Sequence, residues 1–288
     1  MTGFRRVVVG IDGSDAAGEA LALAQRLADP DGVLVLAHVD AHRAFRLPHG
    51  HVREPAAAPL DAARAQVEGD RPVTCVVRAA NSAARGLTEI AEDERADLIV
   101  LGSHRPAPEG GIAAGRIAAR LLHGGPCAVA IAPAGAAERD RFHHVGVAYD
   151  ASAEAAAALA AAYAVAARDR AAASIYLCIP PIGAGYGGEV GAEIDQAAQA
   201  QRVRAQEQLD AAADDAPHGV NPRTVLLRGN PADEIARACD GIVDLLFAGS
   251  RGYGPMHRAL VGSVSEALAR SARHPVVVMP RSVAAGEA

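Results

Sequence analysis

Glycine and serine residues near the C-terminus are spaced as in an anion-binding loop. Gly249 and Gly252 follow an apolar segment, and nine residues separate Gly252 from Gly262 and Ser263. Glycine allows the backbone to approach a ligand without a Cβ in the way. A helix is predicted over 263–273, and its first amides would point at the same space. The arrangement is suited to holding a phosphate; a glycine-rich connection to a capped helix is the alternative interpretation.

A degenerate copy of this loop lies 147 residues earlier in the chain (residue 102 against residue 249). The first copy keeps Gly102 and Gly115, but Arg105 replaces the second glycine and Arg116 replaces the serine. Two long cationic side chains would then stand where phosphates would lie. They either fill and close this site or bind a different anion, and we expect them to close it.

The loops belong to two halves with the same order of elements, so the chain is an internal duplication. Continuous apolar strands alternate with alanine-rich helical runs, which predicts an α/β fold with a parallel sheet covered on both faces. The predicted domains are 1–138 and 139–288, and segment 133–140 has linker composition. Besides the two strands that end at Asp12 and Asp150, the predicted strands are 33–39, 73–78 and 127–132, then 174–179, 224–228, 243–248 and 275–279.

Charge and composition exclude several classes of function. The formal net charge is −6 and the sequence contains no lysine, so a lysine-dependent P-loop and a pyridoxal Schiff base are excluded. There is no basic run, and only 3% of the residues are aromatic. We therefore predict no nucleic-acid binding.

The sequence also predicts the surroundings of the protein. Charged residues interrupt every apolar stretch before it reaches the length of a membrane span, so we expect no membrane partner. The four cysteines lie far apart without a C-x-x-C pair. We read them as buried thiols of a reduced, cytoplasmic protein.

Other polar residues have side chains of the kinds that metal, ligand and catalytic sites use. His42, His49 and His51 lack a carboxylate or cysteine pattern that would complete a metal site, so we predict a solvated loop and no metal. Asp12 and Asp150 could cap the following turn or meet a ligand; we favour the ligand role for Asp150 and leave both open for Asp12. No nucleophile, base and acid stand in a recognisable order, so we predict no catalytic residue. Slow ATP hydrolysis is the most that we expect.

Four features together resemble the universal stress protein family. They are a strand ending at Asp150, a second strand ending at His38 and Val39, the helix start at 229–231, and the glycine loop. The resemblance covers nearly the whole chain as two tandem copies. It implies two doubly wound, five-stranded parallel sheets of Rossmann-like type that bind adenine nucleotide at the carboxyl ends of the strands. It also implies that the two halves pair through their final strands, with further homo-oligomers possible.

The resemblance assigns binding roles residue by residue. In the first half the equivalent positions would be Ile11, Asp12, Val39, Gly102 and Gly115. In the second half the implied nucleotide-binding residues are Ala148, Tyr149, Asp150, Ile179, Gly249, Gly252, Gly262, Ser263, Val264 and Ser265.

The resemblance therefore implies a stress-response regulatory protein that binds ATP or another adenine nucleotide, alone or together with Mg²⁺. The second domain would hold most of the nucleotide, and binding would change contacts with an unidentified protein partner. One alternative is an ATP-using adenylyl-transfer or pyrophosphatase enzyme of related fold, which segment 11–15 faintly suggests. The other is a structural or dimerisation module whose sites no longer bind.

Overall fold

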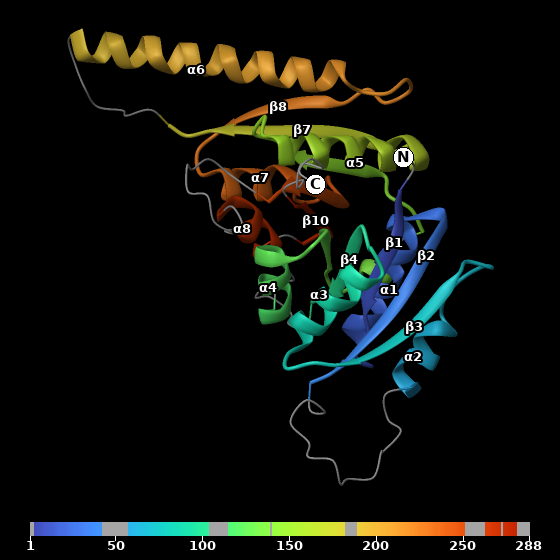
Figure 1. Cartoon of the computed structure of the whole chain (residues 1–288). Helices are drawn as coiled ribbons and strands as arrows, with labels where there is room; N and C mark the ends of the chain where they lie inside the picture. The colour runs from blue at the N-terminus through green and yellow to red at the C-terminus, as the bar shows by residue number, and fades with distance from the viewer. Residues whose placement is uncertain are drawn as a thin grey trace, which may run out of the picture.

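The first half of the chain alternates strands and helices (Figure 1). The computed structural model describes residues 3–41, 57–103, 115–138, 140–181, 189–250, 263–271 and 273–280. The elements of this half are β1 (Phe4–Gly10), α1 (Asp15–Leu27), β2 (Ala28–Asp40), α2 (Ala57–Arg64), β3 (Val73–Ala79), α3 (Ala83–Asp93), β4 (Leu98–Gly102), α4 (Arg116–Gly124) and β5 (Ala128–Ala132).

The second half repeats the same order after a short 3-10 helix, η2 (Ala136–Glu138). The predicted helix over 263–273 begins at Ser263 as expected and ends at Ser271. The elements are β6 (His144–Ala148), α5 (Ala153–Asp169), β7 (Ala172–Ile179), α6 (Glu189–Asp214), β8 (Arg223–Arg228), α7 (Pro231–Cys239), β9 (Leu245–Gly249), α8 (Ser263–Ser271) and β10 (Val276–Met279).

All ten strands form one continuous sheet, in the order β3-β2-β1-β4-β5-β10-β9-β6-β7-β8. Within each half the strands are parallel and doubly wound, as predicted. The halves join where β5 and β10 pair antiparallel, with Ala130 opposite Val277. The predicted pairing of the final strands is therefore confirmed. Because these two strands run in opposite directions, the carboxyl ends of the two parallel sets face opposite edges of the sheet.

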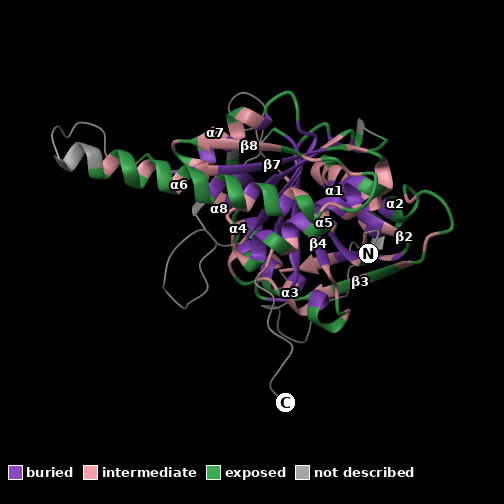
Figure 2. Ribbon diagram, turned by 90° about the horizontal axis from the view of Figure 1, so that it is seen from above, coloured by how far each residue is buried: buried purple, intermediate pink, exposed green. Residues whose placement is uncertain are grey.

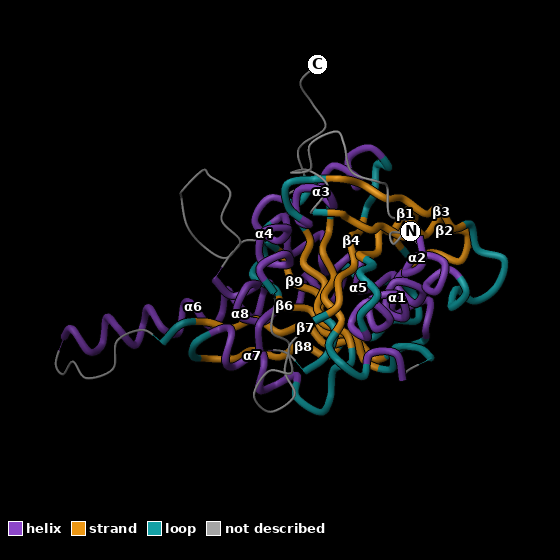
Figure 3. Tube along the Cα trace, turned by 90° about the horizontal axis from the view of Figure 1, so that it is seen from below, coloured by secondary structure: helices purple, strands orange, loops and turns teal. Residues whose placement is uncertain are grey.

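Helices cover both faces of this sheet (Figure 3). Residues of α1, α2, α5 and α6 bury one face, and residues of α3, α4, α7 and α8 bury the other. Each of the two apolar clusters extends through both halves, so the halves share their core. None of the helices in the described ranges is long and apolar enough to cross a membrane.

The segment between the halves is fixed to helix α1. The carboxylate of Glu19 accepts hydrogen bonds from the amides of Gly135 (2.9 Å) and Ala137 (2.6 Å). The guanidinium of Arg26 donates to the carbonyl of Ala136 and lies 4.8 Å from the ring centroid of Phe142. A cation over an aromatic face is attracted to it. Hydrogen bonds to α1 therefore hold residues 135–137 of the predicted linker in place.

The outer edges of the two halves differ most. Helix α2 has 8 residues, whereas α6 has 26 and runs past the sheet at its N-terminal end (Figures 1 and 2).

The edge strand β3 carries several exposed side chains, including that of Cys75. The prediction that all cysteines are buried is therefore wrong, because Cys75 is exposed and Cys178 only half-buried.

The register of the sheet also corrects one correspondence between the halves. Gly10 pairs with Ala37 in the first half, and its counterpart Ala148 pairs with Tyr176 in the second. Two residues further along, Val39 therefore corresponds to Cys178, not to Ile179. Tyr176 stands where the first half has Ala37.

Candidate functional site

Asp12 and Asp150 each stabilise the turn that leads from the first strand into the first helix. Oδ1 of Asp150 accepts hydrogen bonds from the amide (3.0 Å) and the hydroxyl (2.5 Å) of Ser152. The Ser152 hydroxyl in turn caps α5 by accepting from the amide of Ala155 (3.1 Å). Asp12 makes the same two contacts with Ser14. The capping role is thus present in both halves, and in each it uses a single carboxylate oxygen.

The residue after each aspartate has a left-handed backbone conformation. Gly13 has φ of +84°, and its counterpart Ala151 has φ of +59°. Glycine adopts such angles freely, whereas an alanine there is strained. The second half therefore keeps a strained turn beside Asp150, and strained backbone occurs preferentially at binding sites.

The strand ends at Gly102 and Gly249 touch the first turn of the neighbouring helix. A Cβ on Gly249 would lie 2.8 Å from the amide nitrogen of Ala155, and one on Gly102 would lie 1.8 Å from the carbonyl oxygen of Ala16. The hydroxyl of buried Ser265 donates to the Gly249 carbonyl and so ties α8 to β9. Gly249 thus brings β9, α5 and α8 together at one point.

Glu154, in the first turn of α5, lies against Gly249 and is 7% exposed. A carboxylate at this end of a helix is stabilised by the positive end of the helix dipole. The carbonyl carbon and Cβ of Glu154 are among the atoms nearest to the position that a Cβ on Gly249 would take.

The family resemblance implies ligand contacts for both Tyr149 and Ile179. The Tyr149 amide donates to the carbonyl of Tyr176 (2.9 Å), and the Tyr149 ring packs against the core on the α5 and α6 face. Burial raises the pKa of the Tyr149 phenol. Ile179 is buried on the same face, and its carbonyl accepts from the amide of Gly229 (3.1 Å). The register places the half-buried Cys178, which the sequence reasoning missed, on the opposite face.

Part of the predicted phosphate loop lies outside the described residues. This holds for Gly252 and Gly262, and also for Arg105 in the first half. Ser263 and Val264 begin helix α8, as the loop pattern predicts. His42, His49 and His51 likewise fall outside the described ranges. Within those ranges no three histidine, cysteine, aspartate or glutamate side chains gather as a metal site would require.

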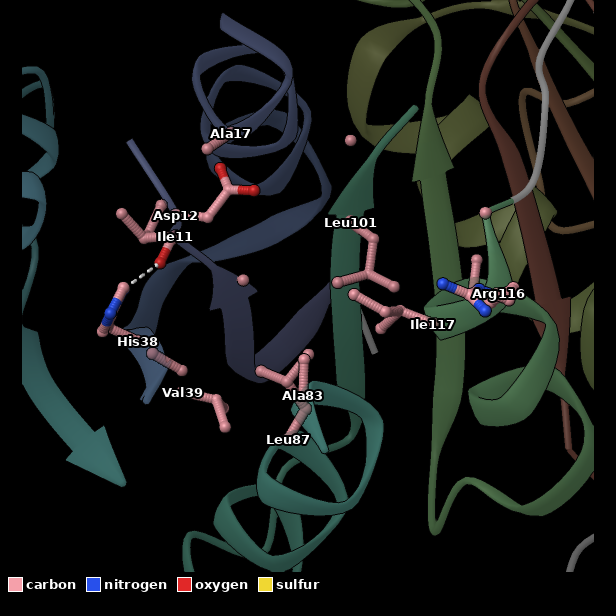
Figure 4. Close-up of a pocket in the computed structure, with 15 residues that line it drawn as sticks. Ile11, Asp12, Ala17, His38, Val39, Ala83, Leu87, Leu101, Arg116 and Ile117 are labelled. Atoms are coloured by element: carbon pink, nitrogen blue, oxygen red, sulfur yellow. Dashed lines mark hydrogen bonds between the residues drawn. The ribbon is translucent and has the colours of Figure 1, made fainter. Parts of the chain in front are cut away.

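The first half contains a cavity of about 290 Å³ at the carboxyl ends of its strands (Figure 4). It lies where β1 and β4 diverge to helices on opposite faces, which is where open α/β sheets bind ligands. Arg116 is among the residues that line this cavity. Arg105 lies outside the described residues, so the closing of this position by the two arginines stays a prediction. Other lining residues include Gly10, Ile11, Asp12, Ala37, His38, Val39, Leu87, Leu101, Gly102, Gly115 and Ile117.

Comparisons with known proteins agree with this architecture. The model of the universal stress protein family matches residues 3–133 and again 141–280. The chain therefore belongs to the universal stress protein family, as a member with two tandem copies. A search of curated proteins finds no match.

Three solved structures share the fold over nearly the whole chain. A protein of unknown function from Pseudomonas aeruginosa PAO1 is 18% identical, with a TM-score of 0.71 over 97% of this chain and 93% of that one. A putative universal stress protein from P. aeruginosa UCBPP-PA14 is 17% identical, with a TM-score of 0.66 over 97% and 94%. A universal stress protein from Archaeoglobus fulgidus DSM 4304 is 17% identical, with a TM-score of 0.59 over 98% of both chains.

Proposed function

We propose that this chain is a regulatory protein that binds an adenine nucleotide, with ATP held mainly by its second domain. The binding residues would be those predicted around Asp150, Gly249 and the start of α8. Cys178 joins them, since the sheet register makes it the counterpart of cavity-lining Val39. Nucleotide binding would alter the surface offered to a protein partner. We place the protein in the cytoplasm, which agrees with its charge and its unpaired cysteines.

The observation that carries this proposal is the meeting of β9, α5 and α8 at Gly249. The glycine leaves no room for a side chain, Ser265 fixes its carbonyl, and Ser263 begins the helix that follows the loop. Backbone amides at the start of a helix of this kind stabilise a phosphate. Ser265, whose hydroxyl already binds Gly249, would position the loop, whereas Ser263 would contact the phosphates.

Mg²⁺ would fit this site for an electrostatic reason. The chain supplies no lysine, and Asp150 and the buried Glu154 bring negative charge to the same region. A divalent cation bound to the polyphosphate would offset this repulsion. Mg²⁺ usually keeps several waters and binds through phosphates and one or two carboxylates.

Substitution of Gly252 tests the proposal directly. Gly252→Arg gives the second half the residue type that the first half has at the matched position. It should weaken ATP binding at least about 100-fold, equivalent to roughly 2.7 kcal/mol, because contacts to the phosphates are lost. Isothermal titration calorimetry measures the affinity, and circular dichroism checks that the fold is intact.

Gly18→Arg is the matched control. Gly18 lies in α1, where a side chain would meet no atom within 4 Å, so the same change should leave ATP affinity unaltered. Equal affinities of the Gly252→Arg variant and the unmodified chain would overturn the assigned site. A well-folded, unmodified chain that does not bind ATP would favour the structural module instead.

A further inference from the structure

We propose that segment 193–204 of helix α6 is a dimerisation surface, which pairs antiparallel with the same segment of a second copy of this chain. The surface belongs to the second half alone, since the counterpart helix α2 has only 8 residues. It is separate from the contact between β5 and β10, which joins the halves within one chain. The dimer would form with or without a bound nucleotide.

One face of α6 continues past the part of the helix that covers the sheet. Ala205, Leu209 and Ala212 are buried in the core that α6 shares with the sheet. Residues three and four positions apart lie on the same face of a helix. The same spacing toward the N-terminus gives three half-buried residues, namely Ile194, Ala198 and Gln201. Between 193 and 204 no side chain is buried, and this part of α6 leads away from the sheet (Figures 1 and 2).

The charges of this segment have the order that an antiparallel copy of it requires. Acidic residues come first, at Glu193 and Asp195, and basic residues follow at Arg202 and Arg204. In a contact with two-fold symmetry, residue i meets residue j and residue j meets residue i. With the two-fold axis between positions 198 and 199, Glu193 meets Arg204 of the second copy. In the same register Asp195 meets Arg202 of the second copy, so every charge of the segment faces its opposite.

The paired charges also lie on matching sides of the helix. Asp195 and Arg202 are separated by about two helical turns, so both flank the shared face on one side. Glu193 and Arg204 are separated by about three turns and flank it on the other side. An antiparallel two-fold pair brings each side of one helix to the same side of its copy, as at the flanking positions of coiled coils. The charges would therefore border an apolar contact on both sides.

These charged side chains are available in the single chain. All four are exposed, and among the described residues none of them has a hydrogen-bond or ion-pair partner. A parallel pair would set Glu193 against Glu193 of the second copy, so repulsion excludes that orientation. Ala198 lies near the proposed axis, where its small side chain allows the two helices to approach closely. Ile194 would then lose water-exposed apolar surface against the second copy.

The size of the contact sets its expected strength. Segment 193–204 is about 18 Å long, so the pair buries less surface than a standard interface of roughly 800 Å² per partner. We therefore expect a dimer with a dissociation constant on the order of 10 to 100 µM. Exposed ion pairs are screened by salt, so the dimer should weaken as ionic strength rises.

Sedimentation equilibrium of the full-length chain without nucleotide measures this association. The chain should be a monomer at about 1 µM and largely a dimer at about 300 µM in low salt. Raising the salt to about 0.5 M should weaken the dimer at least about threefold. Because no nucleotide is present, the result does not depend on the function proposed above.

Two charge variants test the register. The acidic variant carries Arg202→Glu and Arg204→Glu, and the basic variant carries Glu193→Arg and Asp195→Arg. Each alone should dimerise at least about tenfold more weakly, because like charges then face each other. An equimolar mixture should form a heterodimer at least as tight as the unmodified dimer, since every facing pair is again of opposite sign.

Glu207→Arg is the matched charge control. Glu207 is exposed on the same helix but lies outside the segment, so the dissociation constant should stay within about twofold.

A second pair of variants tests the face of the helix. Ile194→Ser should weaken the dimer at least about tenfold, because it removes apolar surface from the contact. Val203 lies about two and a half turns further along, on the opposite face, and is 46% exposed. Val203→Ser should therefore leave the dissociation constant within about twofold.

Three outcomes would overturn the proposed dimer. The first is an unmodified chain that stays monomeric over the whole concentration range. The second is a dimer that neither charge variant weakens, which would place the contact on another surface. The third is a mixture of the two charge variants that stays monomeric, while circular dichroism shows that both are folded.

Discussion

The two halves of this chain share the contacts that fix the ends of their first and fourth strands. They differ in the side chains beside those strand ends. In both, an aspartate fixes the turn after the first strand and a glycine brings the fourth strand against the first helix. The neighbouring residues have diverged. The second half has Tyr176 where the first has Ala37, and Ser263 where the first has Arg116. Close contacts therefore fix the strand ends in both halves, whereas the positions beside them differ.

The antiparallel junction explains how the two sites can differ without conflict. Because β5 and β10 run in opposite directions, the two sites lie at opposite edges of one sheet. The two halves share a core but no strand end. The described residues that line the first-half cavity all come from the first half.

The largest expected effect compares Gly102 with Gly249. A Cβ at Gly102 would overlap the Ala16 carbonyl, at 1.8 Å, whereas at Gly249 the nearest atom is 2.8 Å away. Gly102→Ala should lower the free energy of unfolding by about 3 kcal/mol and Gly249→Ala by about 1 kcal/mol, since forced overlap displaces the backbone. Urea unfolding measures both values.

Gly124→Ala is the control for this pair. Gly124 ends α4 and has no atom within 4 Å of a new Cβ, so alanine should not lower the free energy of unfolding. Equal losses of unfolding free energy in Gly102→Ala and Gly249→Ala would show that packing at the strand ends does not differ between the two halves.

The fold was predictable because its signals are local and repeated. Buried strands and the duplicated order of elements appear directly in the sequence, and Asn230 caps α7 at the predicted helix start. Ser82 caps α3 at the corresponding place in the first half. The pairing of the two final strands followed from the family resemblance. The family model, with its two matches, confirms the recognised resemblance.

The correspondence between the two halves at the second strand could not be predicted, because it depends on the pairing register. The positions that the family resemblance implied for the first half do line its cavity, namely Ile11, Asp12, Val39, Gly102 and Gly115. The ends of the two strands match Val39 with Ile179, but Ile179 belongs to the core on the opposite face of the sheet. A shift of one residue along a strand exchanges its two faces. Only the paired strands show that Ala37 and Tyr176 are counterparts. Likewise, the effect of replacing Ser263 by Arg116 depends on room that no sequence pattern records.

An effect of intermediate size is expected for the reactivity of a thiol at the second-half site. If Cys178 is the counterpart of cavity-lining Val39, bound ATP should protect it from a thiol reagent, while exposed Cys75 remains reactive. At ATP ten times above its dissociation constant, modification of Cys178 should slow about tenfold, because the free site is depleted by that factor. Peptide mass spectrometry after timed alkylation gives both rates.

The Val39→Cys variant extends this test to the first half, because Val39 lines the first-half cavity. If the second domain holds most of the nucleotide, ATP should protect Cys178 more strongly than the new thiol at position 39. Equal protection of both thiols by ATP would remove the distinction between the two halves.

The smallest expected effect concerns the strained turn beside Asp150. Ala151 has φ of +59°, and the matched Gly13 has φ of +84°. Ala151→Gly should stabilise the chain by about 0.5 kcal/mol, since the relief of backbone strain is partly offset by a more flexible unfolded chain. Gly13→Ala should destabilise the chain by about 1 kcal/mol because of its positive φ. A Cβ at this position would lie 3.6 Å from Pro59, an ordinary contact that adds no clash.

If the strain at Ala151 serves the site, Ala151→Gly should also loosen the turn and weaken ATP binding while the free energy of unfolding rises. Calorimetry and urea unfolding on the same samples separate the two quantities. Stabilisation without any loss of ATP affinity would show that the strain has no part in binding and that the turn is only a less well fitted version of its counterpart.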